Sequence, residues 1–139
     1  MKNKIQKSIL AGVVATAVMT AIMLIAPMMG MPKMNPAEML SGMMGFPLAV
    51  GWFMHFMIGV IFALLYSVVF SEFFQINNKI FSGALFGFVV FLFAQVMMFM
   101  MNMMIGGMMQ PEGSMVLMMI GSIFGHIIFG IVVSIVVNK

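Results

Sequence analysis

The chain contains no cysteine, no aspartate and no arginine, and its six lysines are accompanied by only three glutamates. Without cysteine it can form no disulfide, no thiolate metal site and no catalytic thiol. Charged residues make up 6% of the 139 residues, whereas hydrophobic residues make up 64%. A soluble domain of this length cannot bury so much apolar surface. We therefore expect residues 1–139 to form a single transmembrane domain in a lipid bilayer.

The lysines predict the orientation of the chain in that bilayer. Five of them fall on one side of the expected spans and one, Lys33, on the other; the five are Lys2, Lys4, Lys7, Lys79 and Lys139. Because positive charge accumulates on the cytoplasmic side, both termini are expected in the cytoplasm. The net charge of +3 is thus a sign of topology, and we expect no nucleic-acid partner.

Four apolar runs are each long enough to cross the hydrocarbon region as helices. We place them at about 8–29, 48–70, 79–101 and 115–137. Prolines and glycines separate the runs, and the segment from Ser71 to Lys79 reads as a short polar turn. The start could be read as a signal peptide, but its apolar run is too long for that, so we expect a retained helix. The predicted fold class is an all-α, integral membrane four-helix bundle.

The chain reads as a duplicated two-helix hairpin. A shift of 71 residues without a gap keeps all four helices in register, and it superposes His55 on His126 and Gly59 on Gly130. Further identities are Ile9 with Ile80, Gly12 with Gly83, Val18 with Val89 and Phe53 with Phe124. Since each half has two helices, both halves run in the same direction and form a parallel repeat.

Small residues at four-residue spacing mark the expected helix interfaces, because they let two backbones approach closely. The second helix carries Gly51, His55, Gly59 and Ala63, and the fourth carries Ser122, His126, Gly130 and Ser134. The packing glycines that we predict are Gly12, Gly51, Gly59, Gly83, Gly87 and Gly130. The two histidines lie on these stripes and should face the interior.

His55 and His126 are the only histidines, and an ionisable group inside a membrane suggests a functional site. One hypothesis is a b-type haem held by both imidazoles between the second and fourth helices, which would sit diagonally in the bundle. Neighbouring glycines would leave room for the macrocycle. The lack of arginine speaks against haem, because no arginine is available to pair with the propionates.

A second hypothesis is a copper(I) site, because the chain has 23 methionines and thioethers are soft ligands that select Cu(I). Met39 and Met43, and Met97 and Met101, have the four-residue spacing that aligns sulfurs on one helix face. With His55 and His126 they form the candidate metal set. Methionine also packs flexibly against aromatic rings, and 15 phenylalanines are available for that.

The structural alternative is that each histidine donates a hydrogen bond to a hydroxyl or carbonyl on a neighbouring helix. Candidate partners are Thr16, Thr20, Tyr66, Gln95, Asn102 and Ser122. Solute or proton transport usually needs buried carboxylates, but all three glutamates read as loop residues. Hydrolysis is disfavoured because no carboxylate or nucleophile motif accompanies either histidine. We therefore expect no enzymatic activity.

The segment after the first span predicts a short surface helix from Pro36 to about Met44. Asn35 reads as its N-cap, with Pro36 at the first helical position and Glu38 at the third. The helix is apolar enough to lie in the membrane interface, and it could equally contact a partner subunit.

The arrangement resembles small bacterial inner-membrane proteins of unknown function, broadly the YagU-like group. The resembling motifs are Gly12…Thr16…Met19-Thr20, the loop Pro27…Gly30-Met31-Pro32-Lys33-Met34, Gly51-Trp52…His55…Gly59…Tyr66 and Gly125-His126…Gly130. The resemblance implies a multi-pass protein of the bacterial inner membrane and brings no known activity. Our interpretation is an accessory or scaffolding component of a membrane complex, working with partner subunits or as a homo-oligomer.

Overall fold

The computed structural model describes residues 2–105 and 113–138. It contains α1 (Lys2–Ile25), a 3-10 turn η1 (Ala26–Met29), α2 (Pro36–Met44) and α3 (Leu48–Leu65). A π-helical turn η2 (Tyr66–Phe70) and the short α4 (Ser71–Phe73) continue α3, and α5 (Lys79–Ile105) and α6 (Met115–Val137) follow. No strand occurs in the described ranges. The expected loop around Gln110–Ser114 lies mostly outside them.

Four stretches are long and apolar enough to cross a membrane: Asn3–Met29, Leu48–Phe73, Lys79–Met104 and Met115–Val137. This confirms the predicted all-α, four-helix membrane fold. The boundaries differ from the expected ones mainly at the charged ends. Helix α1 begins at Lys2 instead of near residue 8, since lysines in a first turn can extend their amines toward water. The expected turn at Ser71 is still helical as far as Phe73.

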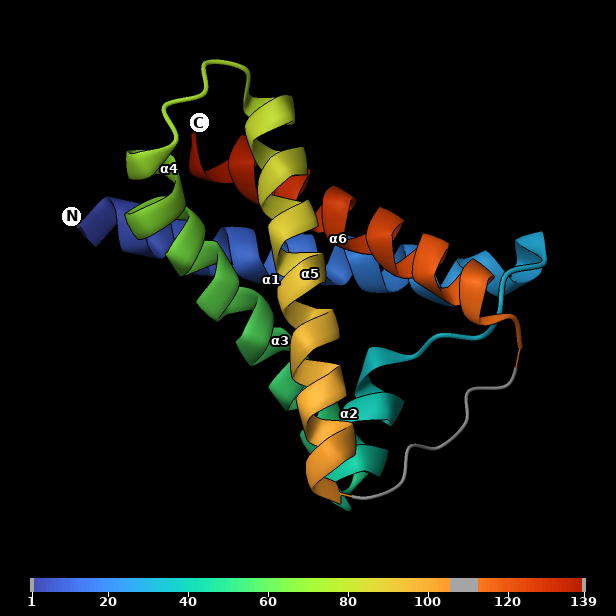
Figure 1. The fold of residues 1–139 in the computed structure, drawn as a ribbon. Helices are drawn as coiled ribbons and strands as arrows, with labels where there is room; N and C mark the ends of the chain where they lie inside the picture. Colours follow the sequence, from blue (N-terminus) through green and yellow to red (C-terminus); the bar gives the residue numbers. More distant parts are fainter. Residues whose placement is uncertain (1, 106–112, 139) are drawn as a thin grey trace.

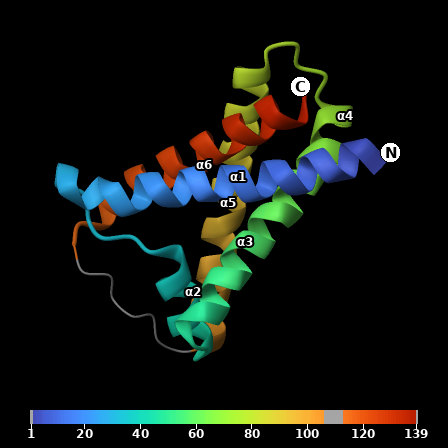
Figure 2. The ribbon, with the colours of Figure 1, turned by 180° about the vertical axis from the view of Figure 1, so that it is seen from behind.

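The helices form two crossing pairs. Helices α1 and α6 lie side by side, α3 packs on α1, and α5 packs on α6. The pair α1 and α6 crosses α3 and α5 steeply, so the two pairs diverge toward one end, where α2 packs on α3 (Figures 1 and 2). The steep crossing follows from glycines that bring the backbones together at a point.

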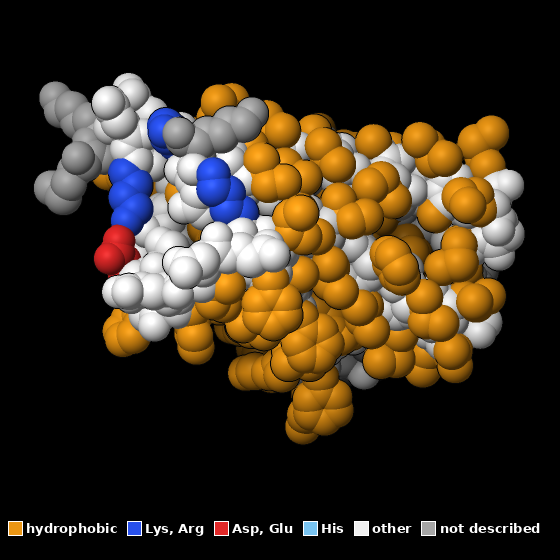
Figure 3. Space-filling model, turned by 90° about the horizontal axis from the view of Figure 1, so that it is seen from above, with side chains coloured by type: hydrophobic (Ala, Val, Ile, Leu, Met, Phe, Trp, Pro, Cys, Tyr) orange, Lys and Arg blue, Asp and Glu red, His pale blue; other side chains and the backbone are white. Residues whose placement is uncertain are grey.

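Both chain termini, α4 and the connection to α5 lie at the same end, which we call the terminal end (upper left in Figure 1). Lysine side chains gather there beside one glutamate, and the neighbouring flank is apolar (Figure 3). The interior is built along α1, where Ala11, Ala15, Met19 and Met23 follow one another at four-residue spacing and are all buried. This spacing is that of one helix face.

The predicted surface helix is confirmed as α2. The Asn35 side chain accepts hydrogen bonds from the backbone amides of Ala37 and Glu38 at 3.1 and 3.3 Å, as an N-cap does. Gly45 ends the helix with a φ of 67°, a conformation that glycine adopts without strain. One face of α2 is not free, because Ala37 and Ser41 are buried.

Candidate functional site

The interface of α1 with α3 is a contact between backbones. A Cβ added to Gly12 would lie 2.5 Å from Val60 Cα, and one added to Gly59 would collide with the Thr16 side chain. Only glycine fits at such a contact, since a Cβ so close to another backbone forces the helices apart. Gly12 and Gly59 therefore have the packing role that the sequence predicted.

The interface of α5 with α6 is built in the same way. A Cβ on Gly83 would lie 2.5 Å from the carbonyl oxygen of Gly130, and one on Gly87 would meet the carbonyl of His126. A Cβ on Gly130 would lie 2.7 Å from Gly87 Cα. Gly51 was also expected to pack between long helices, but a Cβ there would meet the Ala37 carbonyl, so Gly51 packs against α2.

His55 is buried on α3 and faces α1. Its Nε2 lies 2.9 Å from the hydroxyl of Thr20, and its ring meets Trp52 and Phe56 edge-on. Thr20 is one of the hydroxyl partners expected from the sequence. The hydrogen bond joins two helices at a fixed register, which is the structural role that polar side chains often have inside membranes.

His126 lies on α6 and has a different environment. Its Nδ1 lies 2.7 Å from the backbone carbonyl of Ser122, and because a carbonyl only accepts, Nδ1 carries the proton. The ring also meets Phe91 of α5 at 6.0 Å between centroids. Ser122 was an expected partner, but the expectation of a neighbouring helix was wrong: it lies one turn earlier on α6. Side chains four apart on a helix share a face, so the nearest carbonyl was local.

Thr20 and Thr16 both face α3, but we expect their replacement by valine to change the unfolding free energy differently. Thr20→Val keeps the shape but removes the hydroxyl bonded to His55, so we expect a loss of about 1 kcal/mol in unfolding free energy. Thr16→Val should cost nothing or stabilise, because the Thr16 hydroxyl is buried without a hydrogen-bond partner in the described residues. Unfolding in mixed detergent micelles measures both variants. An equal loss in both would show that the His55 hydrogen bond contributes nothing.

The arrangement does not fit a resident haem. A bis-histidine haem needs a ring nitrogen from each imidazole directed at one iron. The Nε2 of His55 is instead held by Thr20 of α1, a helix that packs against both α3 and α6. The Met19 and Met23 side chains of α1 are buried against Gly125, next to His126. A macrocycle between the histidines would have to break that bond and displace these side chains.

The four candidate methionines lie on other helices than the histidines. Met39 and Met43 lie on α2, and Met97 and Met101 lie on α5. Met39 is 45% exposed and Met97 40%, so these two side chains face outward. The contacts of both histidines are instead with hydroxyl, carbonyl and aromatic groups. Within the described ranges, no cluster of three histidine, aspartate or glutamate side chains could hold a metal ion.

Other methionines pack on α6. A Cβ on Gly125 would lie 2.6 Å from Met23 Cε and 3.8 Å from Met19 Sδ, and one on Gly121 would lie 3.6 Å from Met34 Sδ. The glycines thus make a shallow face on α6 that thioether side chains fill. Methionine often fills irregular spaces in this way, so packing alone explains why these methionine sulfurs lie near the bundle interior.

A polar network at the terminal end was missed by the sequence analysis. The Tyr66 hydroxyl lies 3.0 Å from Ser82 Oγ and 2.6 Å from Ser134 Oγ, and it accepts a hydrogen bond from the Asn138 amide at 3.1 Å. Tyr66 is 1% exposed and begins the π-helical turn. The network connects α3, α5 and α6. Its residues are common and far apart in sequence, so only the single tyrosine could have pointed to it.

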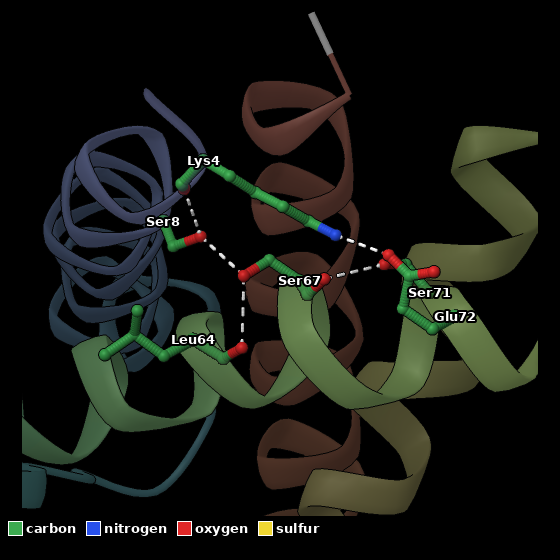
Figure 4. A network of polar contacts seen from close by, with 6 residues as sticks. All are labelled: Lys4, Ser8, Leu64, Ser67, Ser71 and Glu72. Atoms are coloured by element: carbon green, nitrogen blue, oxygen red, sulfur yellow. Dashed lines mark hydrogen bonds and ion pairs between the residues drawn. The ribbon is translucent and has the colours of Figure 1, made fainter. Parts of the chain in front are cut away.

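A second, separate polar cluster at the terminal end involves α1. Ser8 donates to Ser67 at 2.7 Å, Ser67 donates to the Leu64 carbonyl, and Ser71 donates to the Ser67 carbonyl (Figure 4). Lys4 forms an ion pair with Glu72 at 2.5 Å beside these serines. The two clusters together place hydrogen-bonded polar residues of all four long helices at the terminal end.

No curated protein and no solved structure shows a significant match to this chain. The expectation of a protein without an assigned activity agrees with the family comparison, while the YagU-like group and a bacterial source stay predictions. The chain matches the family of unknown function DUF6789 over residues 2–139 and therefore belongs to that family.

Proposed function

We propose that the protein is a non-enzymatic membrane protein that acts as an accessory component of a larger membrane assembly. The observation that carries this proposal is the one-sided packing of α5. Among the four candidate spans, the one formed by α5 is the least buried: 22% of its apolar stretch is buried, against 39% for the span that contains α1. Helix α5 packs mainly on α6 and meets α3 and η2 through a few side chains such as Phe86 and Phe93, whereas the side chains on the face directed away from α6 are exposed.

This face, the α5 outer face, consists of large apolar side chains that recur along one side of the helix. They are Phe81, Phe88, Leu92, Val96, Phe99 and Met103, and all are exposed. Aromatic side chains dominate the energetics of many protein interfaces because they bury a large area at low entropic cost. The expected occupant is a transmembrane helix of another protein. The interior supports a structural role, since both histidines are engaged in hydrogen bonds.

The proposal predicts that Phe99→Ala reduces the amount of a copurifying membrane partner about tenfold, the effect of losing one aromatic anchor. The measurement is the molar ratio of partner to protein after purification from native membranes in mild detergent. Phe53→Ala on α3 and Phe124→Ala on α6 are matched controls, because these phenylalanines are 68% and 64% exposed against 63% for Phe99. Both controls should keep the partner ratio.

A partner ratio that is unchanged by Phe99→Ala would exclude the α5 outer face as the binding site. If the protein instead forms a complex with itself that Phe99→Ala dissociates, the occupant is a second copy and the protein is a homo-oligomer. Loss of the partner in all three variants would mean that general apolar exposure holds it, which contradicts a specific interface.

We also propose that both termini are cytoplasmic in a bacterial inner membrane. The proposal is supported by the positions of the lysines, because Lys4, Lys7 and Lys79 lie at the terminal end, whereas Lys33 lies at the opposite end, beside α2. A fluorescent protein fused after Lys139 should fluoresce in the cytoplasm, whereas alkaline phosphatase fused there should be inactive. Active phosphatase would reverse the orientation.

The duplicated hairpin is part of the same proposal. Two contacts of the first half recur 71 positions later: the Gly12 contact with Val60 corresponds to that of Gly83 with Ile131, and Ser8 with Ser67 corresponds to Lys79 with Asn138. The pairing of α1 with α3 is thus similar to that of α5 with α6. The contacts between the two halves are not equivalent, since α1 packs closely on α6, while α3 approaches α5 less closely, for example at the Phe62 and Phe93 rings.

A further inference from the structure

A cavity of about 420 Å³ opens at the terminal end between α1, α4 and α6. Its lining combines cationic and amide side chains with one carboxylate: Asn3, Lys4, Lys7, Ser71, Glu72, Val137 and Asn138. The lining residues lie at the ends of three candidate membrane spans. The cavity therefore lies at the level where the helices leave the hydrocarbon and lipid headgroups begin.

The only carboxylate of the lining is already paired. Glu72 binds Lys4 at 2.5 Å, and Ser71, which precedes Glu72, donates to the Ser67 carbonyl (Figure 4). Ser67 is in turn bonded to Ser8 of α1. This chain of contacts fixes the wall formed by α4 against α1. The ion pair is close to neutral as a unit, so the charge of the cavity comes from its other residues.

Those residues are cationic or hydrogen-bond donors. Lys7 lies one turn from Lys4, and no described carboxylate forms an ion pair with it. Asn138 is positioned by its hydrogen bonds to Tyr66 and Ser134, and Lys79 donates to the Asn138 carbonyl at 2.7 Å. Once the ion pair is counted as neutral, Lys7 is the charged lining residue that remains, and Lys79, which is not part of the lining, adds a second positive charge next to Asn138. A basic pocket between transmembrane helices at this depth favours an anionic headgroup.

We propose that this cavity binds the phosphate diester of an anionic glycerophospholipid, with Lys7 as its main cationic contact. The acyl chains would lie along the apolar flank beside the cavity (Figure 3). The phosphate would lie on the Lys7 side, because the Glu72 carboxylate repels an anion from its own edge. The inference requires the membrane location and is independent of the proposed partner on α5.

The test is a titration of the full-length protein in neutral detergent with phosphatidylglycerol or phosphatidylcholine, with bound lipid counted by native mass spectrometry. We expect one phosphatidylglycerol to bind more tightly than phosphatidylcholine. Lys7→Gln should weaken phosphatidylglycerol binding about fivefold, the effect of one interfacial lysine. Lys33→Gln, at the opposite end of the fold, is the matched control and should change binding little.

Glu72→Gln gives a result of the opposite sign. It releases Lys4 from its ion pair, so phosphatidylglycerol should bind about fivefold more tightly. Glu38→Gln is its control, because Glu38 is paired with Lys33 at 3.5 Å outside the cavity. Equal effects of Glu72→Gln and Glu38→Gln would show a dependence on net charge alone and would overturn the site.

Inorganic phosphate distinguishes a lipid headgroup from a free anion. At millimolar concentration it should leave bound phosphatidylglycerol in place, because it lacks the acyl chains. Displacement of the lipid by phosphate would overturn the lipid assignment. Equal binding of the two lipids, or no effect of Lys7→Gln beyond that of Lys33→Gln, would overturn the proposal as a whole.

Discussion

Gly130→Ala is expected to lower the unfolding free energy of the protein by about 3 kcal/mol, the upper range for overpacking a closed contact. The new Cβ would lie 2.5 Å from Gly87 N and 2.7 Å from Gly87 Cα. These are backbone atoms, so no rotamer change can relieve the overlap. Helices α5 and α6 would have to separate along their whole interface. Unfolding by denaturing detergent in mixed micelles measures the loss.

Gly125→Ala is the matched control on the same helix. Its Cβ would approach Met23 Cε at 2.6 Å, but that atom is the far end of a flexible side chain. Methionine can rotate away at little cost. We therefore expect less than about 1 kcal/mol for Gly125→Ala. Similar losses at both positions would mean that α6 responds to any added volume, and that the backbone contact with Gly87 is not the cause.

The spans could be predicted because each depends on a local signal. A run of apolar residues is sufficient for a membrane helix, and the Asn35–Pro36–Glu38 pattern contains the whole start of α2. The glycines at the crossings were also predictable, since only small residues allow such an approach. The sequence pattern does not determine which helix each glycine packs against. Gly51 and Gly59 belong to the same stripe of α3 with four-residue spacing, yet Gly51 packs on α2 and Gly59 on α1.

The candidate site was only partly predictable. That His55 would bind a hydroxyl could be anticipated, and Thr20 was among the candidates. A helical position alone does not determine which ring nitrogen is engaged, and so the haem hypothesis could not be tested before the fold was known. The candidate methionines were chosen by spacing, but the side chains buried near His126 are Met19 and Met23 of another helix. Four-residue spacing shows that two side chains share one face of a helix, but it does not show which neighbouring helix that face contacts.

Tyr66→Phe is expected to destabilise the protein by about 2 kcal/mol. The substitution keeps the ring, which stacks on Phe70 at 5.7 Å, and removes only the hydroxyl. Ser82, Ser134 and Asn138 then lose a shared partner at the place where α3, α5 and α6 meet. A buried polar group without a partner costs more than its hydrogen bond contributed. Mixed-micelle unfolding again gives the size of the loss.

Ser82→Ala tests whether the hydrogen bonds of the Tyr66 hydroxyl stabilise the protein cooperatively or independently. It removes one of the three contacts of the Tyr66 hydroxyl and leaves the other two in place, so we expect about 0.5–1 kcal/mol. If the hydroxyl acts as the centre of a cooperative network, the double variant should lose little more than Tyr66→Phe alone, because both changes remove the same interaction. Additive losses would show that Ser82 and Tyr66 stabilise the protein independently. The polar groups at the terminal end would then be separate contacts, and the orientation of Asn138 beside the lipid cavity would not depend on Ser82.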